Sequence, residues 1–210
     1  MLPALLPLFP LPRVVLFPHT FLQLHIFEPR YRQMTAECLA SHQHFILVLT
    51  RTHEWPDLVP AATATFGTGC LARIVKTEAL PDGRFNILVQ GRQAVRIQEE
   101  PSNRLFRQAR WEAEPFDAEA PWPEDARGAF TESLFRFAGR FDLMAQVKQL
   151  LDLDLAPAVL LNTLAMALDL DPVEKQFLLE APGLPSLADR FHQVLDFTLH
   201  GRDMPGGPSA

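Results

Sequence analysis

The stretch FPHTFLQLHIFEPRYRQMTAECL, residues 17–39, contains a break, a strand and a helix start in direct succession. Pro18-His19-Thr20 interrupts the chain after the apolar run 14–17, which we interpret as a strand. Residues 21–26 then predict a second strand. Glu28-Pro29 predicts the start of a helix, because proline is tolerated at the first helical position, where its missing N–H costs nothing.

The helix that begins at Pro29 is expected to be amphipathic. Residues at spacings of three and four share one face of a helix, and here they are Tyr31, Met34, Thr35, Cys38 and Leu39. A strand that leads into a short amphipathic helix this early in the chain sets the geometry for the strands that follow.

Three segments around this region carry a family resemblance: Pro7-Leu8-Phe9-Pro10-Leu11, Val15-Leu16-Phe17-Pro18 and Leu24-His25-Ile26-Phe27-Glu28-Pro29-Arg30-Tyr31. They resemble the start of the Lon N-terminal domain family, the substrate-recognition domain of the Lon protease, which also occurs as small stand-alone proteins. The family usually has proline where this chain has Gln23. Further matches are Gly67-Thr68-Gly69, Pro81-Asp82-Gly83-Arg84 and Glu174-Lys175-Gln176, so the resemblance covers nearly the whole chain.

Length and composition indicate a globular protein of one or two domains. The chain has 210 residues, of which 48% are hydrophobic, and a net charge of −6. The acidic balance argues against a nucleic-acid module. The apolar N-terminus lacks the basic region and cleavage site of a signal peptide, and no stretch reaches the roughly 20 apolar residues that span a membrane. We therefore expect a cytoplasmic protein without a membrane association. Cys38 and Cys70 leave one disulfide open, but two buried thiols are favoured.

The first half predicts strands. Residues 1–12 are punctuated by proline and favour an edge strand or a packed extended arm over a central strand. Pro81-Asp82-Gly83 predicts the turn of a hairpin. Gly91 is expected to allow a sharp bend that separates two strands. The remaining strands are expected at residues 45–49, 71–80, 85–89, 94–97 and 105–111.

The second half predicts helices. Residues 112–123 are acidic and rich in proline, which marks a domain boundary. Helices follow, of which 157–168 is apolar on nearly all sides and is predicted to be the buried central one. Asp171-Pro172-Val173-Glu174 is a helix start signal, and Ser186 begins the last helix. The predicted domains are 1–115, β-barrel-like, and 116–201, a helical bundle, with a disordered tail at 202–210.

The predicted fold class is α+β. The resemblance implies a small mixed β-barrel of the PUA-like Lon N-domain type with one short helix, followed by a C-terminal α-helical bundle. Glycines 67 and 69 precede a strand, whereas a phosphate-binding loop opens a helix, so we interpret them as permitting a bulge or a tight bend.

No motif of catalysis or metal binding is found in the chain. GxxxxGK[ST], GxSxG, HExxH and CxxC are all absent from the sequence. In Lon proteases the proteolytic part uses a serine–lysine pair on a separate C-terminal domain, and this chain resembles only the recognition domain, without the ATPase and protease domains. We therefore expect no enzyme activity, no catalytic residue, no cofactor and no metal. A peptidase name would be inherited from homology.

The candidate binding residues are Phe27, Glu28, Arg30 and Tyr31, which combine aromatic rings with a charge pair. Aromatic residues and arginine are enriched at binding hot spots, and interfaces between domains favour ligand sites. These four residues are predicted to line a cleft between barrel and bundle. The structural alternatives are a buried ring for any phenylalanine, a helix N-terminal acid for Glu28 and an ion pair for Arg30.

The first functional hypothesis is a non-catalytic module that binds exposed apolar segments of proteins or peptides. By its resemblance, it would serve as an adaptor in protein quality control, with an ATP-dependent protease as a partner. A hydrolase or another enzyme with an unrecognised interdomain site is the alternative. A second alternative is an RNA-binding PUA-like module that uses a basic stripe of Arg92, Arg96, Arg104, Arg107 and Arg110. The sequence does not give the oligomeric state.

Overall fold

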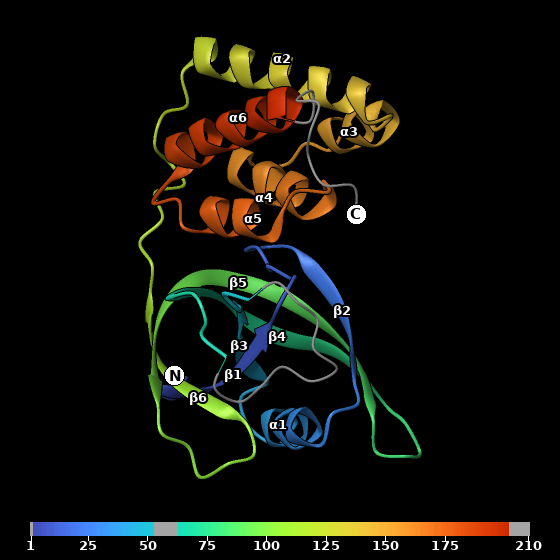
Figure 1. The fold of residues 1–210 in the computed structure, drawn as a ribbon, viewed down its shortest axis with the longest axis vertical. Helices are drawn as coiled ribbons and strands as arrows, with labels where there is room; N and C mark the ends of the chain where they lie inside the picture. Colours follow the sequence, from blue (N-terminus) through green and yellow to red (C-terminus); the bar gives the residue numbers. More distant parts are fainter. Residues whose placement is uncertain (1, 53–62, 202–210) are drawn as a thin grey trace. The chain divides into compact units, whose positions relative to one another are not determined.

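A computed structural model describes residues 2–52 and 63–201 of the chain. The sequence of residues 51–60 predicts a loop, and most of it lies outside these residues, as does the predicted disordered tail 202–210. The described part has an α+β fold with a six-stranded mixed sheet and six helices (Figure 1). In chain order the elements are β1 (Leu5–Leu11), β2 (Phe21–Ile26), α1 (Pro29–Leu39), β3 (His44–Leu49), β4 (Thr68–Ala79), β5 (Phe85–Glu100), β6 (Arg107–Ala113), α2 (Glu124–Arg140), α3 (Met144–Leu151), α4 (Pro157–Ala167), α5 (Pro172–Leu179) and α6 (Leu184–Gly201).

The chain forms two compact units. The first consists of the described part of Met1–Glu114 together with Leu170–Glu180, so it holds the sheet, α1 and also α5. The second consists of Pro115–Asp169 and the described part of Ala181–Ala210, with α2, α3, α4 and α6. The domain boundaries predicted from the sequence and the predicted helical bundle stay predictions.

The sheet of the first unit has the strand order β2-β5-β4-β3-β1-β6, and β5 also pairs with β6. Its only parallel pair among the described strands is β1 with β3. The pairings of five strands therefore form a circuit, whereas β2 stands outside it and pairs with β5. This arrangement is possible because β5 is long: its first part pairs with β2 and its last part with β6. The barrel shape itself stays a prediction.

The prediction of an edge strand or extended arm for residues 1–12 is wrong, because β1 lies between β3 and β6 in the sheet. The two neighbours are staggered along β1. Residues 5–8 pair with β6 and residues 8–11 pair with β3, so only Leu8 has a partner on both sides. Pro7 and Pro10 thus each pair with one strand only, and a proline is tolerated where one side of the strand carries no ladder.

Residues 14–17 are not a strand, and Gly91 does not divide two strands. Val15, Leu16 and Phe17 are buried in a segment without strand pairing, and β5 runs unbroken through Gly91. The turn that follows Phe17 places His19 at φ 67° and is held to Gly91 by two backbone hydrogen bonds: His19 N donates to Gly91 O at 2.8 Å, and Gly91 N donates to Thr20 O at 2.9 Å.

The glycine at position 91 is needed for this close approach. A Cβ atom there would lie 2.0 Å from the carbonyl oxygen of Phe17. The register between β4 and β5 also shifts next to this position, from Leu71 opposite Gln93 to Ala72 opposite Gly91, which is a β-bulge. Gly91 therefore lets a buried segment approach the strand, and β5 continues through it beside the bulge.

The predictions for β2, α1, β3 and the hairpin of β4 and β5 are confirmed. Tyr31, Met34, Thr35 and Cys38 form the buried face of α1. The turn has Gly83 at φ 79°, in the left-handed region that favours glycine. The last strand of this half begins two residues later than predicted, at Arg107.

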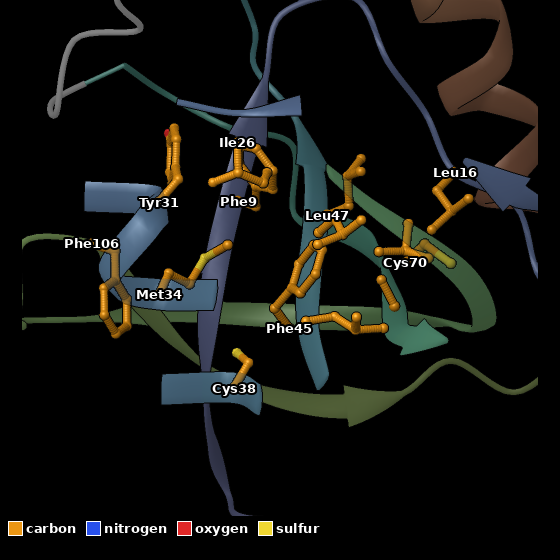
Figure 2. Packing of buried hydrophobic residues seen from close by; sticks show 14 residues of the cluster. Phe9, Leu16, Ile26, Tyr31, Met34, Cys38, Phe45, Leu47, Cys70 and Phe106 are labelled. Carbon is orange, nitrogen blue, oxygen red and sulfur yellow. The ribbon is translucent and has the colours of Figure 1, made fainter. Parts of the chain in front are cut away.

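The buried face of α1 packs into the main core of the first unit. Figure 2 shows Met34 and Cys38 from the helix facing Phe45 and Leu47 of β3. Residues of β3 are buried almost completely, with exposed fractions of 0–1% for residues 45–49. This core fixes the N-terminal end of α1, where the candidate residues lie.

In the second unit, α2 buries Phe130, Leu134 and Phe137. The helix predicted at 157–168 to be the buried central one is α4, and it is buried only in part: Leu161, Asn162, Leu164 and Ala165 are its buried residues. The last helix begins two residues earlier than predicted, at Leu184. No helix in the described ranges is long and apolar enough to span a membrane.

The predicted start signal at 171–174 is a capping box at α5, in the first unit. The side chain of Asp171 accepts a hydrogen bond from Val173 N, and the side chain of Glu174 accepts one from Asp171 N. Gln176 of this helix is 1% exposed and donates from Nε2 to Thr68 O, at the first residue of β4, at 3.0 Å. The second half of the sequence thus contributes one helix to the unit that contains the sheet.

Candidate functional site

The four candidate residues lie at the junction of β2 and α1, and their environments differ. Phe27 lies between the two elements with 53% of its surface exposed, and its ring stacks on His25 with 6.1 Å between the ring centres. Phe27 is therefore the apolar side chain of the four that is open to a partner.

Glu28 and Arg30 form an ion pair. The Arg30 guanidinium lies 2.7 Å from Glu28 Oε2, and the two side chains are only 20% and 14% exposed. Glu28 is the N-cap of α1, but its carboxylate pairs with Arg30 and makes no capping hydrogen bond. The ion-pair interpretation of Arg30 is therefore confirmed. The guanidinium also lies 4.6 Å from the centre of the Tyr31 ring, a cation–π arrangement that holds it over this ring.

Tyr31 is 4% exposed and belongs to the core. Its ring packs on Phe9 with 4.2 Å between the centres (Figure 2). Burial raises the pKa of Tyr31 to about 12, and the nearby Arg30 charge only partly offsets this rise. The phenol is thus neutral at physiological pH. Its hydroxyl is buried and has no hydrogen-bond partner among the described residues.

A hollow of about 240 Å³ lies beside the start of α1 and the connection between β5 and β6. Arg30 and Tyr31 line it, whereas Phe27 and Glu28 do not. Across from them lie Glu99, Arg107 and Leu105, and Leu105 is 67% exposed. The structure therefore brings together two of the four predicted residues and adds Leu105. The sequence assigned Leu105 to a strand, where alternation gave no sign of its exposure.

The arginines proposed as a basic stripe are largely neutralised by glutamates. Four of the five form ion pairs within the first unit: Arg96 with Glu114, Arg104 with Glu37, Arg107 with Glu99 and Arg110 with Glu100. The fifth, Arg92, donates to the side chain of Gln90. Binding to a phosphate backbone draws on cations that replace its counterions, so this surface offers little support for an RNA-binding function.

The two cysteines are buried free thiols, as favoured from the sequence. Burial raises the pKa of each thiol to about 12, whereas the ordinary value is 9.0. Since the thiolate is the nucleophile, neither residue is activated for covalent catalysis. Within residues 2–52 and 63–201, no three His, Cys, Asp or Glu side chains are grouped to hold a metal ion.

All four candidate residues belong to the first unit. The cleft between barrel and bundle that they were predicted to line stays a prediction. Within the first unit, the junction of β2 and α1 offers an exposed aromatic ring, an internally neutralised ion pair and a hollow next to a neutral phenol. We call Phe27, Glu28, Arg30, Tyr31 and Leu105 the junction site. Its geometry suits binding of an uncharged segment rather than proton transfer or metal chemistry.

Curated proteins with similar sequences are Lon proteases. The chain is 29% identical over 183 residues to the Lon protease of Trichlorobacter lovleyi, which covers 85% of this chain and 22% of that protein. It is 28% identical over 209 residues to the Lon protease of Roseiflexus castenholzii, covering 97% of this chain and 25% of that one. The chain thus spans about a quarter of the length of these relatives.

Solved structures show the same fold. A Lon N-terminal domain protein from Xanthomonas campestris superposes with a TM-score of 0.62 at 21% identity, covering 96% of this chain and 99% of that one. The N-terminal domain of the Mycobacterium avium complex Lon protease superposes with a TM-score of 0.61 at 16% identity, covering 93% and 98%. The model of the ATP-dependent protease La (LON) substrate-binding domain matches residues 5–199, and the chain belongs to that family.

Proposed function

We propose that this chain is a recognition module that binds exposed apolar segments of other proteins and carries out no chemistry of its own. The observation that carries the proposal is the match of residues 5–199 to a substrate-binding domain. The chain's sequence contains neither a P-loop nor a nucleophile motif. The further parts of the proposal are a cytoplasmic location, an adaptor role and an ATP-dependent protease as partner.

We place the binding surface at the junction site. Phe27 and Leu105 supply exposed apolar area, and both are large enough to act as anchors. The charges nearby are already paired, Arg30 with Glu28 and Arg107 with Glu99. A charged ligand would have to compete with these pairs, whereas an uncharged segment would leave them intact. The role of Arg30 is to hold the wall of the hollow through Glu28 and the Tyr31 ring.

The test is binding to a permanently unfolded, fluorescently labelled protein, with its folded form as the comparison. We expect binding of the unfolded form with a Kd of roughly tens of micromolar, typical of a transient contact. Phe27→Ser and Leu105→Ser should each weaken it about fivefold, since an apolar anchor contributes about 1 kcal/mol or more. The matched control is Phe197→Ser, which removes an equally large ring that is 72% exposed on α6. Phe197 belongs to the second unit, whereas the junction site belongs to the first.

Two outcomes would count against the proposal. If the wild-type protein binds the unfolded and folded forms equally, or neither at about 100 μM, recognition of exposed segments is wrong. If Phe197→Ser weakens binding as much as Phe27→Ser does, the junction site is wrong while the function stands. The partner proposal is checked separately by co-purification with a full-length ATP-dependent protease.

A further inference from the structure

The strand that leads into the junction site has a free edge. Among the described strands, β2 pairs with β5 alone, so its other side carries no ladder. The N–H and C=O groups on that side are available in pairs, two residues apart, as along every strand edge. Such an edge binds another extended chain most readily.

The register identifies which residues present their main chain to the free side. Gly91 N donates to Thr20 O, so the main chain of Thr20 faces β5. Alternation then directs Leu22, Leu24 and Ile26 toward β5. The main-chain groups of Phe21, Gln23 and His25 consequently face away from it.

A second set of contacts independently identifies the same outward-facing residues of β2. Ile74 N donates to Gln43 O, so the main chain of Ile74 faces away from β5. Ile74 lies opposite Val89, which must then direct its own main chain to the other side, toward β2. Val89 lies opposite Leu22, and this pair is therefore hydrogen-bonded. The outward set is again Phe21, Gln23 and His25.

The residues of the free edge lack the side chains that usually block strand addition. Residues 21–26, FLQLHI, include no proline, lysine or carboxylate. Proteins generally protect an exposed edge with such residues. The three outward residues are all exposed, whereas Leu22 and Leu24 are half-buried and Ile26 is buried against the core. Leu22, Leu24 and Ile26 thus anchor the strand to the first unit. The main-chain groups of the other three residues remain open to a partner strand.

We propose that an extended segment of a partner protein binds by adding a strand to the free edge of β2, through the main chain of Phe21, Gln23 and His25. The inference rests on the proposed function and specifies how this chain, which has Gln23 where the family usually has proline, holds the segment. Main-chain hydrogen bonds read no particular side chain, so one edge accepts many sequences. Phe27 follows β2 directly and offers apolar contact at the end of the added strand.

A second copy of this chain is the other occupant that an open edge accepts, and the size of the edge argues against it. The six-residue strand that carries the three outward residues is roughly 17–20 Å long. Pairing two such strands buries far less than the roughly 1,200 Å² of a stable, specific interface. A weak and reversible hold on an extended segment is therefore the better match.

The decisive variant is Gln23→Pro. Proline removes the outward N–H of residue 23 and places its ring at the free edge, while the bonds of Leu22 and Leu24 to β5 remain. Leu22 is already extended, as a residue before proline prefers. We expect wild-type thermal stability within a few degrees and about tenfold weaker binding of the labelled unfolded protein. Gln23→Ala keeps the N–H and should bind as the wild type does.

A second measurement does not depend on any variant folding. The probe is a labelled ten-residue peptide of alternating valine and serine, N-methylated either at every second residue or at every residue. An added strand donates from one edge only, so the half-methylated peptide keeps one free edge and should bind about tenfold or more tightly than the fully methylated one.

The outcomes separate the inference from the function on which it rests. If the wild type does not bind the unfolded protein, the proposed function fails. If it binds, but Gln23→Pro binds as tightly and the half-methylated and fully methylated peptides bind equally, strand addition is wrong and the function stands. A concentration-dependent dimer in sedimentation that Gln23→Pro abolishes would assign the edge to a second copy and overturn the inference.

Discussion

Gly91→Ala should destabilise the first unit strongly, although it adds a single methyl group. The new Cβ would lie 2.0 Å from the carbonyl oxygen and 2.8 Å from the carbonyl carbon of Phe17, and both are backbone atoms that have no alternative rotamer. Ordinary contact begins at 3.4 Å. The segment that precedes β2 must therefore retreat by about 1.4 Å, more than the small voids of a packed core allow.

The magnitude follows from what that retreat breaks. Two backbone hydrogen bonds, His19 N to Gly91 O and Gly91 N to Thr20 O, cannot keep their lengths of 2.8 and 2.9 Å. Each contributes about 1 kcal/mol. Phe17 and Leu16 are fully buried, and loosening their packing adds about 1 kcal/mol or more. We expect a loss of about 3 kcal/mol in the free energy of unfolding.

The assay is chemical denaturation followed by tryptophan fluorescence and circular dichroism, with thermal melting alongside. A loss of about 3 kcal/mol corresponds to a drop of roughly 6–12 °C in the melting temperature of a chain this size. Gly67→Ala is the matched control, because nothing lies within 4 Å of a Cβ at that position, and it should change stability by less than about 0.5 kcal/mol. If Gly91→Ala is as mild as Gly67→Ala, the close approach does not constrain the segment and the reasoning is refuted.

Three further predictions rest on buried groups. Tyr31→Phe removes a hydroxyl that is buried without a partner, so denaturation should show a protein at least as stable as the wild type, by up to about 1 kcal/mol; a loss above 1 kcal/mol would mean that the hydroxyl is bonded. Gln176→Ala removes the donor to Thr68 O and should cost about 1–2 kcal/mol, seen as faster amide exchange in α5; unchanged exchange would contradict it. Burial raises the pKa of both thiols and of Tyr31 to about 12, from 9.0 and 10.0. The unfolded chain therefore loses these protons at lower pH than the folded chain does, so the free energy of unfolding should fall as pH rises above about 9. A thiol reagent at pH 8 should label the native protein only as it unfolds. Rapid labelling of the native protein would disprove the burial of the thiols.

The local elements could be predicted because their signals are short in range. Proline at the first turn of α1, the spacing of its buried face and the Pro81-Asp82-Gly83 turn each depend on neighbours in sequence. The errors at β1 and at Gly91 depend on distant partners. A proline in β1 is acceptable only because β3 and β6 are staggered along it. The role of Gly91 depends on a carbonyl 74 positions earlier in the chain, that of Phe17.

The site was predicted by residue type, and residue type does not tell which atoms reach a surface. In the sequence, Tyr31 belongs both to the aromatic motif and to the apolar face of the helix. In the structure its ring packs on Phe9 and is buried in the core. Leu105 shows the converse, since an apolar residue expected in a strand proves exposed. Three-dimensional placement thus leaves Phe27 and Leu105, and not the Tyr31 ring, as exposed apolar surface.

The free edge of β2 could not be inferred from composition, because an edge is a property of topology. In the middle of a sheet the same six residues, FLQLHI, would have neighbours on both sides and no main-chain groups open to another chain. Their place outside the circuit of strands gives three exposed residues an outward main chain. An unblocked edge is a hazard for aggregation unless binding an extended chain is its use. The edge ends one residue before Phe27, so one extended segment that pairs with β2 also reaches the Phe27 ring. This position favours binding over an aggregation hazard as the explanation of the open edge.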